Sequence, residues 1–186
     1  MPPKVKVTKE DILNTAVAIV RDSGAQTLNA RAVAAALNCS TQPVFSNFAT
    51  MEELRLAVIK EAETLCGEYI RREMKKGEFP AYKASGIAYI RFAKEEKELF
   101  KFLYMRDRTS EAIPEAITFG DEMESFVQNY TGLDQETAKL FHLGMWVYVH
   151  GLATMVATDY LNLDWELISR LLSDAYLGMR KQYGLE

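Results

Sequence analysis

The sequence predicts an all-α chain of about nine helices, with a three-helix head followed by a larger helical body. Apolar residues recur every three or four positions along most of the 186 residues, which is the spacing of one helix face. Capping residues precede several of these runs, and Gly, Asn or Pro follows them. No run alternates cleanly between apolar and polar residues, and the sequence has no Asn-Gly or Asp-Gly hairpin turn, so strands are not expected.

The first helix is expected to begin after Thr8, whose side chain can form a reciprocal cap with Asp11 three positions later. Apolar residues then recur at helical spacing. Gly24 is predicted to end the helix, because glycine readily adopts the left-handed backbone conformation found at many helix ends.

Residues 29–48 predict two short helices joined by a tight turn. Asn29 can cap a helix that runs to about Leu37, and Asn38 is expected to take a left-handed conformation in the turn. Ser40 is expected to cap the third helix, which is about seven residues long.

A long fourth helix is expected from Met51 to Lys76. Thr50 and Glu53 can form a capping pair at its start, and Gly77 can end it. At a rise of 1.5 Å per residue such a helix is roughly 40 Å long. It can therefore connect a head to a body.

The rest of the chain keeps the helical pattern. Further helices are expected near residues 81–95, 96–105, 115–131, 134–160 and 164–183. We therefore expect two domains: residues 1–50 form the head, and residues 51–186 form the body together with the long fourth helix.

Charge is distributed unevenly along the chain, although the net charge is only −4. Residues 1–60 hold seven basic and five acidic side chains, whereas the remainder holds fifteen basic and twenty-one acidic ones. A basic head on an acidic body is what a DNA-binding head needs. A chance fluctuation of a few charges explains the same numbers.

The sequence argues against several protein classes. The two cysteines, Cys39 and Cys66, have no metal-ligand spacing, and the N-terminus has no apolar signal segment, so a reducing cytoplasm is expected. The most apolar stretch, Met145 to Ala157, is too short to span a bilayer and predicts a buried helix. We find no catalytic motif and no metal site, and we expect no cofactor.

The third predicted helix opens with small polar side chains, as a DNA-recognition helix requires. Thr41 and Gln42 can reach base edges, and Gln42 can bind adenine through two hydrogen bonds. Ser46 and Asn47 can reach phosphates. An ordinary helical hairpin with a polar outer face remains an alternative.

The first sixty residues resemble the N-terminal domain of the TetR family of transcriptional regulators. The matching residues hold their order and spacing through the turn and both flanking helices: Thr8, Ile12, Leu13, Ala16, Gly24, Val33, Ala34, Leu37, Asn38, Cys39, Ser40, Val44, Phe45, Asn47, Phe48, Met51, Glu52, Glu53 and Leu54. Phe45, Asn47 and Met51 replace the family's usual Tyr, His and Lys. Because the third helix also lacks Lys and Arg, salt-dependent DNA binding is expected to be weakened.

The resemblance implies a set of DNA-binding residues in the head. They are Arg31, Thr41, Gln42, Pro43, Phe45, Ser46 and Asn47. Independently of the resemblance, Lys4, Lys6 and Lys9 are expected to form a basic arm that binds DNA and, with Arg31, compensates for the uncharged third helix. The resemblance also implies that a dimer would hold two recognition helices about one DNA turn apart, roughly 34 Å.

Two further expectations concern the last two predicted helices. Gly144, Gly151 and Thr158 recur every seven residues on an apolar helix, and Trp146 with His150 and Gly151 resembles a W-x-x-x-H-G signature of one TetR subgroup. The resemblance implies a homodimer through the helices near 134–160 and 164–183. A monomer that uses these helices as its central core is the alternative.

The resemblance also implies that an unknown small-molecule effector binds in the body and releases the DNA. The predicted lining residues are Phe92, Phe102, Met105, Phe119, Met123, Phe126, His142, Trp146 and His150. An aromatic and methionine cluster of this kind can equally be plain core. The alternatives to a repressor are a helical ligand-binding dimer that has lost DNA binding, and a helical enzyme.

Overall fold

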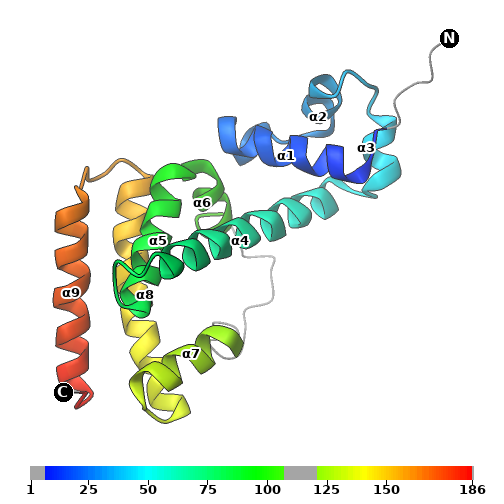
Figure 1. The fold of residues 1–186 in the computed structure, drawn as a ribbon. Helices are drawn as coiled ribbons and strands as arrows, with labels where there is room; N and C mark the ends of the chain where they lie inside the picture. The colour runs from blue at the N-terminus through cyan, green and yellow to red at the C-terminus, as the bar shows by residue number, and fades with distance from the viewer. Residues whose placement is uncertain (1–6, 107–120, 186) are drawn as a thin grey trace. The chain divides into compact units, whose positions relative to one another are not determined.

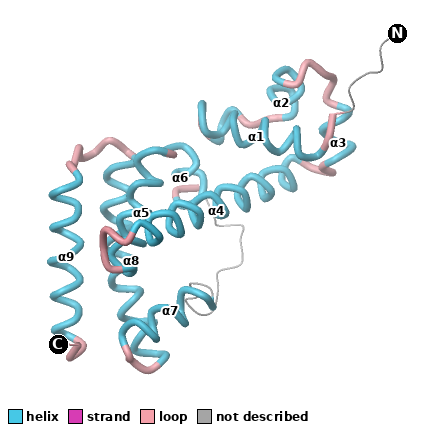
Figure 2. The backbone as a smooth tube through the Cα atoms, viewed as in Figure 1, coloured by secondary structure: helices cyan, strands magenta, loops and turns pink. Residues whose placement is uncertain are grey.

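The computed structural model describes residues 7–106 and 121–185, and these residues form helices joined by loops, with no strand (Figure 2). The predicted all-α fold is confirmed. The described helices are α1 (Lys9–Ser23), the 3₁₀ helix η1 (Ala25–Thr27), α2 (Ala30–Ala36), α3 (Gln42–Asn47), α4 (Met51–Lys76), α5 (Ala81–Glu95), α6 (Lys97–Tyr104), α7 (Asp121–Thr131), α8 (Gln135–Ala157) and α9 (Trp165–Gln182).

The chain divides into two compact units (their helices are labelled in Figure 1). The first unit holds α1 to α3, the start of α4 up to Gly67, and α6; the second holds the end of α4 with α5, α7, α8 and α9. The functional domains expected from sequence, 1–50 and 51–186, stay a prediction, because compactness does not say which residues bind a ligand.

Helix α1 begins and ends as its sequence predicts. The Thr8 hydroxyl accepts the Asp11 amide at 3.1 Å, and the Asp11 carboxylate accepts the Thr8 amide at 2.9 Å. Gly24 follows the helix at φ +82°. A side chain there would be strained and would also meet the side chains of Gln26 and Glu98.

The turn between α2 and α3 differs from the prediction at one residue. Asn29 caps α2, with its side-chain oxygen accepting the amides of the next turn, and Asn38 adopts φ +50° as expected. The predicted cap Ser40 is wrong, because Thr41 occupies the capping position of α3 and its side chain makes no capping bond. Pro43, at the second helical position, has no N–H to donate to such a cap.

The core of the first unit fixes α3 against its neighbours. Val44 and Phe48, on the inner side of α3, are each about 1% exposed. They are buried together with apolar residues of α1, α2 and α4, namely Ile12, Ala16, Val20, Val33, Leu54 and Val58. Burying a large apolar side chain contributes roughly 1.5–3 kcal/mol, so these contacts hold α3 in place.

Only one of the two hydrogen bonds of the expected Thr50–Glu53 capping pair is present at the start of α4. The Thr50 hydroxyl accepts the Glu53 amide at 3.1 Å, but the Glu53 carboxylate accepts the Ala49 amide, at 2.7 Å, rather than that of Thr50. Gly77 ends the helix at φ +69°, as predicted.

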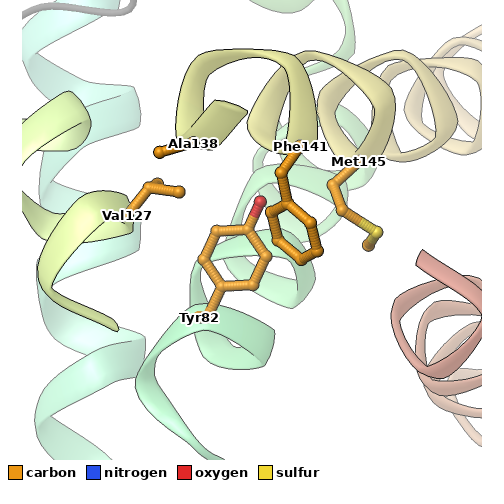
Figure 3. Close-up of a cluster of buried hydrophobic side chains, with 5 residues drawn as sticks. All are labelled: Tyr82, Val127, Ala138, Phe141 and Met145. Carbon is orange, nitrogen blue, oxygen red and sulfur yellow. The ribbon is translucent and has the colours of Figure 1, made fainter. Parts of the chain in front are cut away.

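In the second unit α5, α8 and α9 pack on one another, and α7 packs on α8 (Figure 1). Its core cluster joins three helices: Figure 3 shows the Tyr82 ring of α5 beside the Phe141 ring of α8, with Val127 of α7 nearby. The buried members are Tyr82, Val127, Ala138, Phe141 and Met145.

The body helices start within a few residues of their predicted positions, and the part of the predicted helix 115–131 before residue 121 lies outside the described residues. Helix α8 ends three residues before the expected residue 160. Asp159 adopts φ +55°, and the Tyr160 amide donates to the Met155 carbonyl at 3.0 Å, which closes a left-handed turn.

Helix α8 is longer than the apolar stretch recognised in the sequence. By length and composition alone its 23 residues could cross a membrane, and no other helix of the described residues meets this test. Many core helices meet it too. Phe141, Ala153 and Ala157 of α8 are fully buried, so one side of this helix packs in the core of the second unit.

Candidate nucleic-acid interface and effector region

Helix α3 divides cleanly into an inner and an outer face. Val44 and Phe48 point into the core, whereas Gln42, Phe45 and Ser46 are exposed. Residues three and four apart share one face of a helix, so Thr41, Gln42 and Phe45 lie close together on the outer surface. The structure therefore places Phe45 beside Thr41 and Gln42, the two residues predicted to read base edges.

Two of the predicted phosphate contacts are already bonded within α3. The Ser46 hydroxyl donates to the Gln42 carbonyl at 2.9 Å, and the Asn47 amide donates to the Pro43 carbonyl at 2.8 Å. A phosphate accepts hydrogen bonds but donates none, so Ser46 must rotate before it can bind one. Of the polar side chains on α3, Gln42 is exposed and is not bonded back to its own helix.

The basic residues predicted for DNA binding have different surroundings. The Lys9 ammonium lies 3.5 Å from the Glu53 carboxylate and 4.6 Å from the centre of the Phe48 ring. It therefore contacts α4 and the residue that follows α3. Arg31 is exposed on α2. Lys4 and Lys6 lie outside the described residues.

In the second unit two tyrosines that the sequence analysis missed bind the two histidines. Tyr82 Oη lies 2.9 Å from His142 Nδ1, and Tyr89 Oη lies 2.9 Å from His150 Nδ1. The tyrosines are seven residues apart on α5 and the histidines are eight apart on α8. These near-equal spacings, each about two helical turns, are the signal that could have paired them.

The residues predicted to line an effector pocket fall into separate groups. Trp146 stacks on His150 with ring centres 4.8 Å apart. The Phe126 ring of α7 lies 6.3 Å from the Tyr82 ring, and the Tyr82 ring also contacts His142. Phe92 packs edge-on against Tyr69. Met123 joins the core cluster. Phe102 and Met105 belong to the first unit, and Phe119 lies outside the described residues.

Both histidines are held neutral near pH 7. Burial lowers the pKa of His142 from 6.5 to about 4, against the opposing attraction of Glu124, and burial also lowers the pKa of His150. Two tyrosine–histidine hydrogen bonds, each with a neutral imidazole, thus connect α5 and α8 between otherwise apolar side chains. Hydroxyl and imidazole groups can bind neutral polar atoms of a ligand through hydrogen bonds.

We expect His142 to make the protein less stable in acid. Because its pKa is lower in the folded than in the unfolded chain, the unfolded chain binds more protons between pH 6.5 and 4, and stability falls as the pH falls through this range. Urea unfolding at pH 7 and pH 5 measures this effect. With an allowance for the partial exposure of His142, the free energy of unfolding of His142→Gln should fall by about 1 kcal/mol less than that of the wild type between these pH values. An equal loss in both proteins would contradict this.

The outward faces of α8 and α9 carry apolar side chains. Leu140 and Val147 of α8 are each 58% exposed, and Leu177 of α9 is 60% exposed. The two glycines of the predicted seven-residue repeat, Gly144 and Gly151, have different surroundings. A Cβ added to Gly144 would lie 2.5 Å from Met179 Cε of α9, whereas a Cβ added to Gly151 would have no atom within 4 Å. Gly144 therefore permits close packing inside the protomer.

No metal centre is visible among residues 7–106 and 121–185, where no three His, Cys, Asp or Glu side chains are grouped to hold an ion. The two cysteines are free thiols.

Known proteins match this chain in two independent ways. A family model described as "Tetracyclin repressor-like, C-terminal domain" matches residues 82–174, half of the chain. A TetR-like transcriptional regulator from Rhodococcus sp. RHA1 has a similar crystal structure, with a TM-score of 0.67 and 15% identity over 99% of both chains. No curated protein sequence matches.

The fold is all-helical, with a helix-turn-helix followed by a longer helical region, and it is similar to that of the Rhodococcus regulator. The chain belongs to the TetR family. The family model covers the body, including Trp146, His150 and Gly151, and the resemblance seen in the first sixty residues adds support from the head.

Proposed function

We propose that this protein is a cytoplasmic, sequence-specific repressor that binds a palindromic operator as a homodimer and leaves it when a small effector binds. The observation that carries the proposal is the outer face of α3, where Thr41, Gln42 and Phe45 are presented on a helix fixed from behind by Val44 and Phe48. A helix of this kind can enter the major groove and read base edges.

Selection of bound duplexes from a random DNA pool tests the DNA-binding part of this proposal. We expect a palindrome whose half-sites are centred about 10 base pairs apart, or a multiple of this, because two symmetric recognition helices read successive major grooves. Recovery of no common sequence, from protein shown to be folded, would count against the proposal.

Dimerisation through α8 and α9 is supported by the apolar side chains on their outward faces, which stay exposed among residues 7–106 and 121–185. A charged or polar face would be expected there in a monomer. A twofold interface also makes both protomers present the same surface, as a palindrome requires.

Val147→Ala should weaken the dimer about tenfold, because the truncation removes apolar contact area from both protomers at once. Analytical ultracentrifugation over a dilution series measures this dissociation constant. Leu56→Ala is the matched control, since Leu56 of α4 is 54% exposed but lies in the first unit. A similar effect of both substitutions would contradict an interface on α8.

An effector site in the second unit is supported by the Tyr82–His142 and Tyr89–His150 pairs and by the aromatic rings around them. We propose that the effector contacts this region, with Phe92, Met123, Phe126, His142, Trp146 and His150 among its neighbours. Because the second unit includes the end of α4, a bound effector can act on the helix that leads to the head.

A second candidate is a helical ligand-binding dimer that has lost DNA binding. It is favoured by the absence of Lys and Arg from α3 and by the internal bonds of Ser46 and Asn47. The duplex selection separates the two, because only the repressor enriches a sequence. Turnover of a substrate would instead indicate the helical enzyme weighed from the sequence.

A further inference from the structure

We propose that Phe45 recognises the methyl group of a thymine in each operator half-site, beside the base pair read by Gln42. This inference rests on the proposed function, because it needs α3 to lie in the major groove. It goes beyond that function by assigning a base to Phe45, whose side chain has no hydroxyl with which to bond a phosphate.

The first argument is the unusual exposure of the Phe45 ring. It is 49% exposed, whereas the other two large apolar side chains of this region, Val44 and Phe48, are about 1% exposed. No ring of the described residues stacks on Phe45, so the side chain contributes little to the core. Its phenyl group is available to a partner.

The second argument is the place of Phe45 on the reading surface. Phe45 lies three residues after Gln42 and four after Thr41, so all three share one face of α3. Three residues span about 4.5 Å along a helix, close to one base-pair step of about 3.4 Å. A side chain at position 45 therefore meets a base pair one or two steps from the one at Gln42.

The third argument is chemical. A phenyl ring can neither donate to a phosphate nor pair with the donors and acceptors on base edges. In the major groove only thymine presents an apolar group, its C5-methyl, among the four unmodified bases. An apolar side chain on a reading helix thus favours thymine, and the tied-back hydroxyl of Ser46 offers no competing donor there.

The test replaces thymine by deoxyuridine, which keeps every hydrogen-bonding group and lacks only the methyl. Each thymine of the selected operator is replaced in turn, symmetrically in both half-sites, and binding is measured by fluorescence anisotropy at fixed salt. We expect one position at which affinity falls about fourfold per half-site, or about 15-fold in all, the effect of losing one buried methyl group in each.

The variants assign this methyl effect to one side chain. Phe45→Ala should bind thymine and deoxyuridine operators equally, Phe45→Tyr should keep part of the preference, and Leu56→Ala should keep all of it. The inference is overturned if the wild type shows no sensitive position, or if Phe45→Ala retains the sensitivity. A wild type that binds no duplex sequence-specifically overturns both this inference and the proposed function, whereas methyl-independent binding to a palindrome overturns the inference alone.

Discussion

Gln42→Ala should lower affinity for the selected operator by about 10²–10³-fold, while binding to a scrambled duplex stays nearly unchanged. A bidentate contact between a glutamine and an adenine is worth about 1–3 kcal/mol of discrimination, and a dimer makes it twice. The exposed Gln42 side chain is free of bonds to its own helix, so its truncation leaves the fold of α3 intact. Anisotropy titrations at one salt concentration measure both affinities.

Two control variants make this result interpretable. Gln128→Ala removes another exposed glutamine, from α7, and should leave binding unchanged. Arg31→Ala should weaken all sequences to a similar degree and reduce the salt dependence, which is the behaviour of a phosphate contact. If Gln42→Ala weakens operator and scrambled duplex equally, Gln42 does not read a base.

Arg91→Met should lower the free energy of unfolding by about 1–2 kcal/mol, because it leaves a buried carboxylate with one of its two cations. Arg91 of α5 lies between two other helices of the second unit. Its Nε is 3.6 Å from Glu73 Oε2 of α4, and its guanidinium lies 4.5 Å from the centre of the Trp165 ring of α9. The Glu73 side chain is only 2% exposed and keeps a single close cation, Lys76, once Arg91 is removed.

Urea unfolding at pH 7 measures this effect against a matched arginine. Arg170→Met breaks the exposed Arg170–Asp174 pair of α9, whose side chains are 79% and 65% exposed, and should cost less than about 0.5 kcal/mol. The double variant Glu73→Met/Arg91→Met should recover part of the loss, since the buried carboxylate is then removed together with its cation. Equal effects of the two single arginine variants would refute this account of Glu73.

The helix ends of the head could be predicted because caps depend on residues three positions apart. Thr8 with Asp11, Asn29, and Gly24 all behave as their local chemistry requires. The prediction of Ser40 as the cap of α3 was wrong, because the choice between neighbouring polar residues depends on which backbone amides are free. Pro43 has no amide N–H and so removes one of them. The end of α8 was missed because no glycine marks it, and Asp159 takes the left-handed conformation instead.

The contacts of the second unit could not be predicted in the same way. His142 and His150 stood out in the sequence, but their tyrosine partners lie about sixty residues away on α5. Glu73 appeared as one charge among many at the end of a long helix, and only packing reveals it as buried. Pairing across such distances depends on how helices pack, which a periodic pattern does not specify.

The most direct test of DNA recognition compares affinity for the selected palindrome and for its scrambled sequence at two salt concentrations. A sequence-specific repressor should bind the palindrome at least about 10³-fold more tightly, with both affinities falling as salt rises and the preference persisting. Equal affinities at each salt concentration would contradict the account, because they would show a head that contacts phosphates without reading bases.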